Sequence, residues 1–146
     1  MRLEVLEGNP HPTVAVAESC TGGLLMARIV ATPNSGDWFI GGLVAYQAAA
    51  KFDLLGVEPG PVVTARAAEQ MAGGVRRLFR AGVGLSTTGV AGPETEEGVP
   101  VGTVFVGVAD GRTSHSHRLT LEGDPDEIRE LAVDFAIGRL KVVVQH

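Results

Sequence analysis

Ser19 is the first residue in this sequence whose setting suggests chemistry. It follows the mostly apolar run 13–17 and Glu18, and it precedes Cys-Thr-Gly-Gly at 20–23, after which the chain is again mostly apolar over 24–30. This pattern predicts a buried strand, a tight turn and a helix that ends near Ala31. Backbone amides at the start of a helix stabilise anions and developing oxyanions, which a nucleophilic serine requires in addition to a base. The alternative role for Ser19 is a helix N-cap.

Lys51 is the candidate base for that serine. It belongs to the helix expected over 47–55, where Asp53 is the only other charged residue. Desolvation lowers the pKa of a lysine, so that the neutral amine can accept a proton, and a Ser–Lys pair replaces Ser–His in some hydrolases. Tyr46, the only tyrosine, could orient the amine or bind substrate. The alternatives are a solvated helix lysine and a half-buried strand tyrosine.

A second strand end repeats the composition of the first. Residues 82–86 alternate as a short strand and lead into Thr-Thr-Gly-Val-Ala-Gly-Pro at 87–93. Loops at the ends of neighbouring strands converge where open α/β sheets bind ligands, so we expect the two loops to share one site. The polar stretch 94–98 that follows carries Glu94, Glu96 and Glu97, which we expect to be solvated.

Cys20, His115 and His117 carry three further reactive groups. Because Cys20 is the only cysteine, no disulfide can form within the chain. We expect a small buried thiol there rather than a thiolate activated by the helix start. The two histidines share one face of a predicted strand, as a chelating pair would. Since no third ligand with a recognisable spacing accompanies them, we expect exposed histidines and no metal site.

The elements that must position these residues are those of an α/β fold. Periodicity and breakers predict strands over 13–17, 38–46, 82–86, 101–109 and 113–121, and helices from after Ser19 to about Ala31, over 47–55, from Thr64 and from Asp124. We therefore expect a single three-layer α/β/α domain over residues 1–146. Its sheet should be mixed and mainly parallel, with an antiparallel hairpin near the C-terminus that turns at 110–111.

Local features add detail to this expectation. Gly41 and Gly42 interrupt a strand and indicate a bulge or a close approach of backbone. The helix over 24–30 is apolar nearly all round, which is typical of packing on both sides or against an oligomer partner. Residues 1–12 end in helix breakers and are expected to be the tail of a preceding helix or a linker. The buried stripe of the last helix is expected at Ile128, Leu131, Ala132, Phe135, Leu140 and Val143.

Composition argues against several classes of function. Acidic residues outnumber basic ones by 17 to 12, a formal net charge of −5, and no basic cluster with interleaved aromatic residues indicates nucleic-acid binding. The chain shows no charged-then-apolar leader and no apolar run of the ~20 residues that a membrane helix needs. We expect a soluble cytoplasmic homo-oligomer, a dimer or higher, that acts on a small molecule without nucleic-acid or membrane partners.

Four linked motifs occur in order along nearly the whole chain. They are Glu-Ser-Cys-Thr-Gly-Gly at 18–23, Gly-Gly-Leu-Val-Ala-Tyr at 41–46 with Lys51 and Leu-Leu-Gly-Val at 54–57, Thr-Gly-Val-Ala-Gly-Pro at 88–93, and Pro-Val-Gly-Thr-Val at 100–104. On these residues the sequence resembles the CinA C-terminal domain family. Members of that family include nicotinamide mononucleotide deamidases, also called PncC amidohydrolases, which convert nicotinamide mononucleotide and water into nicotinate mononucleotide and ammonia. Many occur fused to a second domain, and this chain looks like the stand-alone form.

The resemblance implies a site and a reaction. Ser19 would be the nucleophile and Lys51 its base, with Thr88 as a third catalytic position, in an amidase without cofactor or metal. The substrate-binding residues that it implies are Glu18, Cys20, Thr21, Gly22, Gly23, Tyr46, Gly89, Ala91, Gly92 and Pro93. The sequence departs from the family pattern at 94–99, which reads Glu-Thr-Glu-Glu-Gly-Val in place of an Asp-Gly-Gly-type loop. The alternatives to an amidase are a catalytically inactive pyridine-nucleotide-binding module and a structural partner subunit of the same fold.

Overall fold

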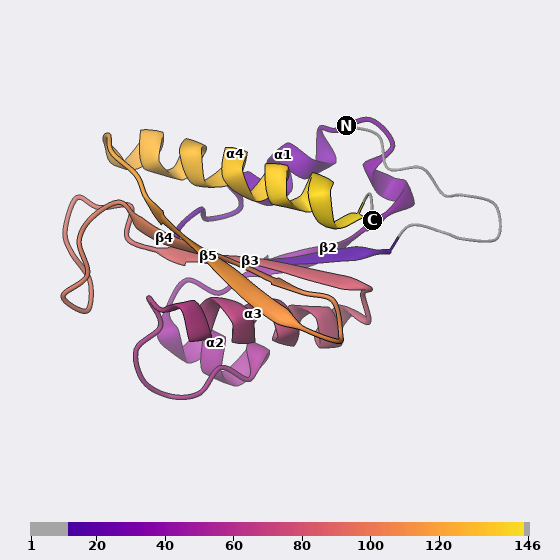
Figure 1. Ribbon diagram of the computed structural model, residues 1–146, viewed down its shortest axis with the longest axis horizontal. Coiled ribbons are helices and arrows are strands. Elements are labelled where there is room, and N and C mark those ends of the chain that lie inside the picture. The colour runs from indigo at the N-terminus through magenta and orange to yellow at the C-terminus, as the bar shows by residue number, and fades with distance from the viewer. Residues whose placement is uncertain (1–11, 145–146) are drawn as a thin grey trace.

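One mixed sheet organises the computed structural model, which describes residues 12–144 (Figure 1). Across that range its five strands follow the order β2-β1-β3-β4-β5. The strands are β1 (Val14–Glu18), β2 (Phe39–Val44), β3 (Val83–Gly89), β4 (Thr103–Ala109) and β5 (Ser114–Thr120). β1 pairs in parallel with β2 and β3, whereas β4 pairs antiparallel with β3 and β5. The mixed sheet and the C-terminal hairpin are confirmed, although parallel pairings make up half of the sheet rather than most of it.

Helices cover both faces of the sheet, as predicted for a three-layer α/β/α domain. Figure 1 shows α1 (Leu24–Val30) and α4 (Pro125–Val144) on one face and α2 (Ala48–Leu55) and α3 (Ala65–Phe79) on the other. Each face has its own buried apolar cluster, with Leu25, Leu85 and Leu140 among the first and Leu55, Met71 and Val75 among the second. A short 3-10 helix, η1 (Ser35–Asp37), connects α1 to β2. Residues 1–11, which hold nearly all of the predicted N-terminal tail or linker, lie outside the described part of the chain.

Polar side chains fix the starts of the helices and the hairpin turn where the sequence predicts them. Thr64 caps α3, because its hydroxyl accepts a hydrogen bond of 3.0 Å from the Ala67 amide. At the start of α4, Asp124 and Glu127 each accept a hydrogen bond from the other's amide, at 2.9 and 3.1 Å. Asp110 closes the β4–β5 turn by accepting from the amides of Arg112 and Thr113. These local signals are therefore confirmed.

The first helix starts later and packs differently from the prediction. Gly22 and Gly23 have φ angles of 58° and 105°, so the chain turns over residues 20–23 before α1 begins at Leu24. Leu25 and Ile29 are buried, but Val30 is 60% exposed, so packing on both sides within the chain is wrong. In α4 the predicted stripe is correct for Ile128, Ala132 and Leu140 and wrong for Leu131, which is exposed.

Gly41 and Gly42 interrupt β2 at a bulge and at a close approach of backbone, as predicted. The pairing of β1 with β2 shifts register between Val14 and Ala15, which marks a β-bulge or irregularity. An added Cβ at Gly42 would lie 2.0 Å from the carbonyl oxygen of Val16 and 2.8 Å from the sulfur of Met26. Only glycine therefore lets β2, β1 and α1 come this close.

Within residues 12–144, no helix combines the length and apolar character that a membrane span requires.

Candidate active site

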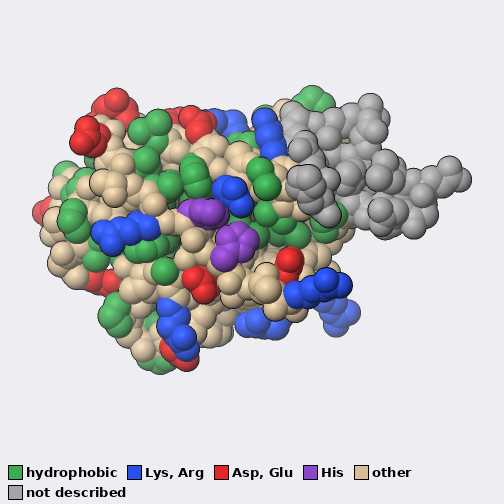
Figure 2. All heavy atoms as spheres, viewed as in Figure 1, with side chains coloured by type: hydrophobic (Ala, Val, Ile, Leu, Met, Phe, Trp, Pro, Cys, Tyr) green, Lys and Arg blue, Asp and Glu red, His purple; other side chains and the backbone are tan. Residues whose placement is uncertain are grey.

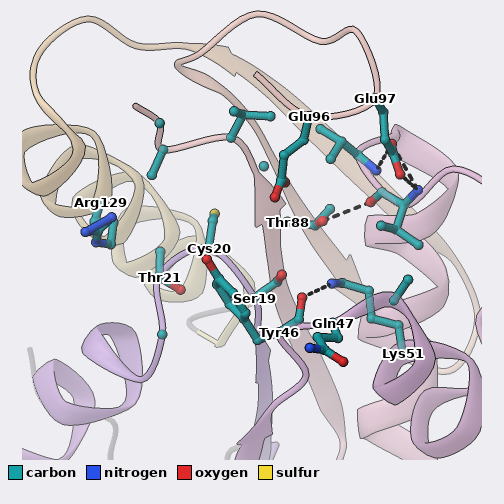
Figure 3. A pocket seen from close by; sticks show the side chains of 18 of the residues that line it. Ser19, Cys20, Thr21, Tyr46, Gln47, Lys51, Thr88, Glu96, Glu97 and Arg129 are labelled. Carbon is teal, nitrogen blue, oxygen red and sulfur yellow. Dashed lines mark hydrogen bonds between the residues drawn. The ribbon is translucent and has the colours of Figure 1, made fainter. Parts of the chain in front are cut away.

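A cavity of about 720 Å³ opens at the carboxyl ends of β1 and β3, where the two predicted loops meet (Figure 3). Its walls also include the start of α2, residues 62–63 and one residue of α4. The stretch 94–98, which we call the acidic loop, completes the lining. The predicted site residues line it except Glu18, Gly23 and Pro93. Val90 and the glutamates Glu94, Glu96 and Glu97 also line it, from the predicted loop at 89–93 and the stretch that follows. Sequence reasoning missed the rest of its lining, which consists of Gln47, Ala48, Val62, Val63 and Arg129.

Ser19 stands at the centre of this site. It follows the last residue of β1 and is only 6% exposed. Figure 3 shows its side chain directed into the cavity, between the loop that carries Cys20 and the amine of Lys51. The amide of Ser19 donates to the hydroxyl of Thr87, at 3.4 Å, which ties the end of β1 to β3.

A chain of hydrogen bonds connects Ser19 to a buried carboxylate. The hydroxyl of Thr21 donates to Glu18 Oε1 over 2.5 Å, and the hydroxyls of Thr21 and Thr87 lie 2.8 Å apart. Because an ionised carboxylate only accepts, the Thr21 proton points to Glu18, and Thr87 must donate to Thr21. Thr87 can then accept from the Ser19 amide without conflict. Glu18 thus sets the direction of the two bonds made by the Thr21 hydroxyl.

Glu18 itself supports the loop and does not line the cavity. Its side chain is fully buried. Oε1 accepts from the amides of Gly23 and Leu25, at 3.1 and 3.0 Å, and Oε2 accepts from the amide of Met26 at 2.8 Å. The amides at the start of α1 are thus held by Glu18, and the expectation that they face a ligand is wrong for these three. The amides of Cys20 and Thr21, earlier in the turn, are not bonded to Glu18.

Replacing Glu18 by glutamine should destabilise the fold. The amide nitrogen of glutamine is a donor, and wherever it lies it faces a group that itself donates, so a buried hydrogen bond becomes a clash of donors. We expect the free energy of unfolding to fall by about 2–4 kcal/mol. Urea denaturation followed by circular dichroism measures this, with the exposed Glu122→Gln as the matched control. A loss no greater than that of the control would contradict the capping role of Glu18.

Lys51 is buried, as the functional reading of the sequence requires. It lies in the first turn of α2, is 2% exposed, and donates from Nζ to the carbonyl oxygen of Tyr46 over 2.9 Å. Burial lowers the pKa of Lys51 below its ordinary value of 10.5, an effect partly opposed by Cys20, Glu96 and Glu97. The predicted alternative of a solvated lysine is wrong. Burial therefore makes the neutral amine easier to form than in a solvated lysine.

Tyr46 orients the lysine through its backbone rather than through its phenol. Its side chain is 66% exposed, so the alternative of a half-buried strand tyrosine is wrong. The residue follows the end of β2 and lines the cavity, while its carbonyl oxygen accepts from Lys51.

Thr88 and the acidic loop hold the opposite wall of the cavity. Thr88, 1% exposed, donates its hydroxyl proton to the carbonyl oxygen of Val62 at 2.9 Å. The carboxylate of Glu97 accepts from the amides of Val62 and Val63, with shortest distances of 2.8 and 2.9 Å. The expectation of a merely solvated side chain is therefore wrong for Glu97, which fastens the acidic loop to the segment before α3. Figure 3 shows the carboxylate of Glu96 pointing into the cavity from the same loop.

Cys20 and the two histidines contribute little reactivity. Cys20 is half-buried rather than buried as predicted, and desolvation raises its pKa to about 12, so its thiolate is disfavoured. His115 and His117 lie with ring centroids 5.4 Å apart, and His117 also packs edge-on against Phe135. Burial is the main cause that lowers the pKa of His117, which is half-buried rather than exposed as predicted. Within residues 12–144 no third His, Cys, Asp or Glu joins them in a group that could hold a metal.

The fold and the site define an α/β domain whose cavity, at the ends of two parallel strands, is built around a buried serine and a buried lysine. The family model described as the CinA C-terminal domain matches residues 5–144. The chain belongs to the CinA C-terminal domain family.

Individual relatives agree with this assignment. A CinA-like protein of Frankia casuarinae is 46% identical over 136 residues, which are 88% of this chain and 31% of that protein. A CinA-like protein of Synechocystis is 47% identical over 139 residues, 88% of this chain and 33% of that protein. The chain thus spans about a third of the length of these relatives. Among solved structures, the competence damage-inducible protein A of Klebsiella pneumoniae is similar with a TM-score of 0.88, 28% identity, and coverage of 93% of this chain and 88% of that one.

Proposed function

We propose that this protein is an amidohydrolase that deamidates nicotinamide mononucleotide to nicotinate mononucleotide and ammonia. The single observation that carries the proposal is the buried amine of Lys51 beside Ser19 in one cavity. The family to which the chain belongs includes enzymes of this activity, and the residues implied as catalytic, Ser19, Lys51 and Thr88, all line that cavity.

In the first half-reaction, neutral Lys51 takes the proton of the Ser19 hydroxyl as its oxygen attacks the carboxamide carbon. The carbonyl electrons move to the oxygen and form a tetrahedral oxyanion. This intermediate collapses as the carbon–nitrogen bond breaks, and the Lys51 ammonium gives its proton to the leaving nitrogen, which departs as ammonia. The product of this step is an ester between Ser19 and the nicotinate group, with Lys51 neutral again.

In the second half-reaction, Lys51 takes a proton from water, and the hydroxide attacks the ester carbon. The intermediate collapses with release of the Ser19 oxygen, which recovers a proton from Lys51, and nicotinate mononucleotide leaves. The amides of Cys20 and Thr21 are the donors for the oxyanion in both steps, because Glu18 holds those at the start of α1.

The charges around the cavity suit a substrate with a cationic ring and a phosphate. The nicotinamide ring of the mononucleotide is a pyridinium, and Glu94 and Glu96 supply carboxylates on one wall. Arg129, in the first turns of α4, supplies a guanidinium on the side of the cavity away from Lys51 (Figure 3). In this proposal the carboxylates of the acidic loop attract the pyridinium ring. The departure from the family pattern at 94–99 is therefore compatible with this substrate.

The purified protein should release ammonia from nicotinamide mononucleotide, and a coupled ammonia assay measures this. Nicotinate mononucleotide, which lacks the amide, serves as the control substrate and should give none. Binding of the mononucleotide in calorimetry without ammonia release would instead support the inactive binding module. Absence of binding to any pyridine nucleotide would support the structural subunit. A cytoplasmic location and a homo-oligomeric state stay predictions.

A further inference from the structure

A second hollow, of about 420 Å³, lies between the outer side of α3 and the β4–β5 turn. We call it the arginine hollow. Its lining consists of Gly56, Arg66, Glu69, Gln70, Gly73, Arg76, Arg77, Ala109, Gly111, Arg112, Thr113 and Ser114. Four arginines thus face one glutamate in a protein whose formal net charge is −5. Figure 2 shows Lys and Arg side chains gathered at the lower right, near this turn.

The arginine hollow is separate from the active-site cavity. In the pairing of β3 with β4, Gly89 and Val104 mark the end at the cavity, whereas Gly84 and Ala109 mark the opposite end. The turn that carries Arg112 directly follows Ala109. Because β3 has seven residues, the two ends lie roughly 20 Å apart.

Two of the four arginines are available to a ligand. Arg66 forms a salt bridge with Glu58 at 2.8 Å, and Arg76 donates to the carbonyl oxygen of Ala81. Within residues 12–144, the guanidinium groups of Arg77 and Arg112 have no hydrogen-bonded or ion-paired partner. Asp110, the acid nearest to Arg112 in the chain, already accepts at Oδ1 from two amides of the turn. Arg77 therefore has no hydrogen-bonded or ion-paired partner within residues 12–144, and Arg112 interacts with the Asp110 carboxylate only through space.

Two glycines of the lining let arginine side chains lie close against the backbone of the hollow. A Cβ at Gly73 would come within 3.2 Å of Arg77 Nη1, and one at Gly111 within 3.0 Å of Arg76 Nη1. Guanidinium groups bind phosphate oxygens with paired N–H donors, so Arg77 at the end of α3 and Arg112 in the turn can serve several oxygens together. The volume of the hollow, about 420 Å³, is larger than the volume of a single phosphate ion.

We propose that the arginine hollow binds a pyrophosphate group, either as the free anion or at the end of a nucleoside diphosphate. Arg77 holds it from the end of α3, and Arg112 holds it from the β4–β5 turn. The site does not depend on the proposed amidase activity, because it shares no lining residue with the active-site cavity.

Isothermal titration calorimetry with inorganic pyrophosphate at low ionic strength tests the site. The unaltered protein should bind one equivalent, and the double variant Arg77→Gln/Arg112→Gln should bind at least about tenfold more weakly. The double variant Arg80→Gln/Lys141→Gln removes the same charge at residues outside the hollow and should bind as the unaltered protein does. Equal weakening in both double variants, or no saturable binding by the unaltered protein, would overturn the proposal.

Amide chemical shifts locate the anion and separate the two proposals. Pyrophosphate should shift the signals of residues 73–77 and 110–114, in Ser19→Ala as in the unaltered protein. Shifts confined to the loops at 19–22 and 88–92 would refute the arginine hollow. Orthophosphate that binds as tightly as pyrophosphate would refute the choice of ligand. A titration with adenosine diphosphate shows which molecule carries the pyrophosphate group. Tighter binding than that of pyrophosphate indicates a nucleoside diphosphate, and equal binding indicates the free anion.

Discussion

Replacing Ser19 by alanine should lower the rate of ammonia release from nicotinamide mononucleotide by about 10⁴-fold or more, because no other group at that position can form the ester. Cys20, the neighbouring nucleophile, has a pKa raised to about 12 by burial and does not substitute for it. The loss should appear in kcat, measured by the coupled ammonia assay, since the hydroxyl acts on the reacting carbon. Substrate binding, measured by calorimetry, should change little.

Two controls make this result specific. Ser35→Ala removes a hydroxyl in η1, outside the cavity lining, and should leave the rate unchanged. The Ser19 side chain makes no hydrogen bond within residues 12–144, so the variant should unfold at the same urea concentration as the unaltered protein. A fully active, folded Ser19→Ala protein would refute the nucleophile.

Local chemistry explains which parts of the fold the sequence could predict. Thr64, Asp124 and Asp110 each act on amides two or three residues away, so their roles follow from the sequence near them. The close packing at Gly42 was predictable for a similar reason, because a glycine inside an apolar strand indicates a close approach of backbone or ligand. The proportion of parallel strand pairings was not predictable from such local patterns. The segment between β3 and β4 contains no helix among the described residues, and without a crossover β4 returns antiparallel.

The site shows the same division. Ser19 and Lys51 were predictable because a strand end before glycines and an isolated lysine in an apolar helix are both local patterns. Thr87 and Glu97 were missed because their partners are distant in sequence, 68 residues away for Ser19 and 35 for Val62. Their side chains resemble those of any polar loop until the sheet brings the partners together. The placement of Glu18 beneath the loop likewise depends on the turn geometry of Gly22 and Gly23.

Replacing Lys51 by methionine should lower the rate of ammonia release by about 10³-fold, within the range that removal of a general base produces. Methionine fills a similar volume and cannot take a proton, so the change isolates proton transfer. The matched control is Lys141→Met, at the only other lysine, which is exposed in α4 and lies outside the cavity lining. That variant should keep the full rate.

The pH dependence identifies Lys51 as the base more directly than the rate alone. Burial lowers the pKa of Lys51 below 10.5, so the active, neutral amine should form as pH rises through that lowered pKa, and kcat should rise with it. Lys51→Met should lose this rise. A residual rate with the unaltered rise would assign the base to another group.

The same pKa shift makes a separate prediction about stability. Between the lowered pKa of Lys51 and 10.5, the unfolded chain binds the proton that the folded protein releases, so the free energy of unfolding should increase with pH across that window. Lys51→Met should not show this increase, whereas Lys141→Met should. Urea denaturation at several pH values measures both variants. This increase in stability requires only that the amine of Lys51 is buried. If the increase is observed but the protein releases no ammonia, Lys51 is buried as described and its catalytic role alone is refuted.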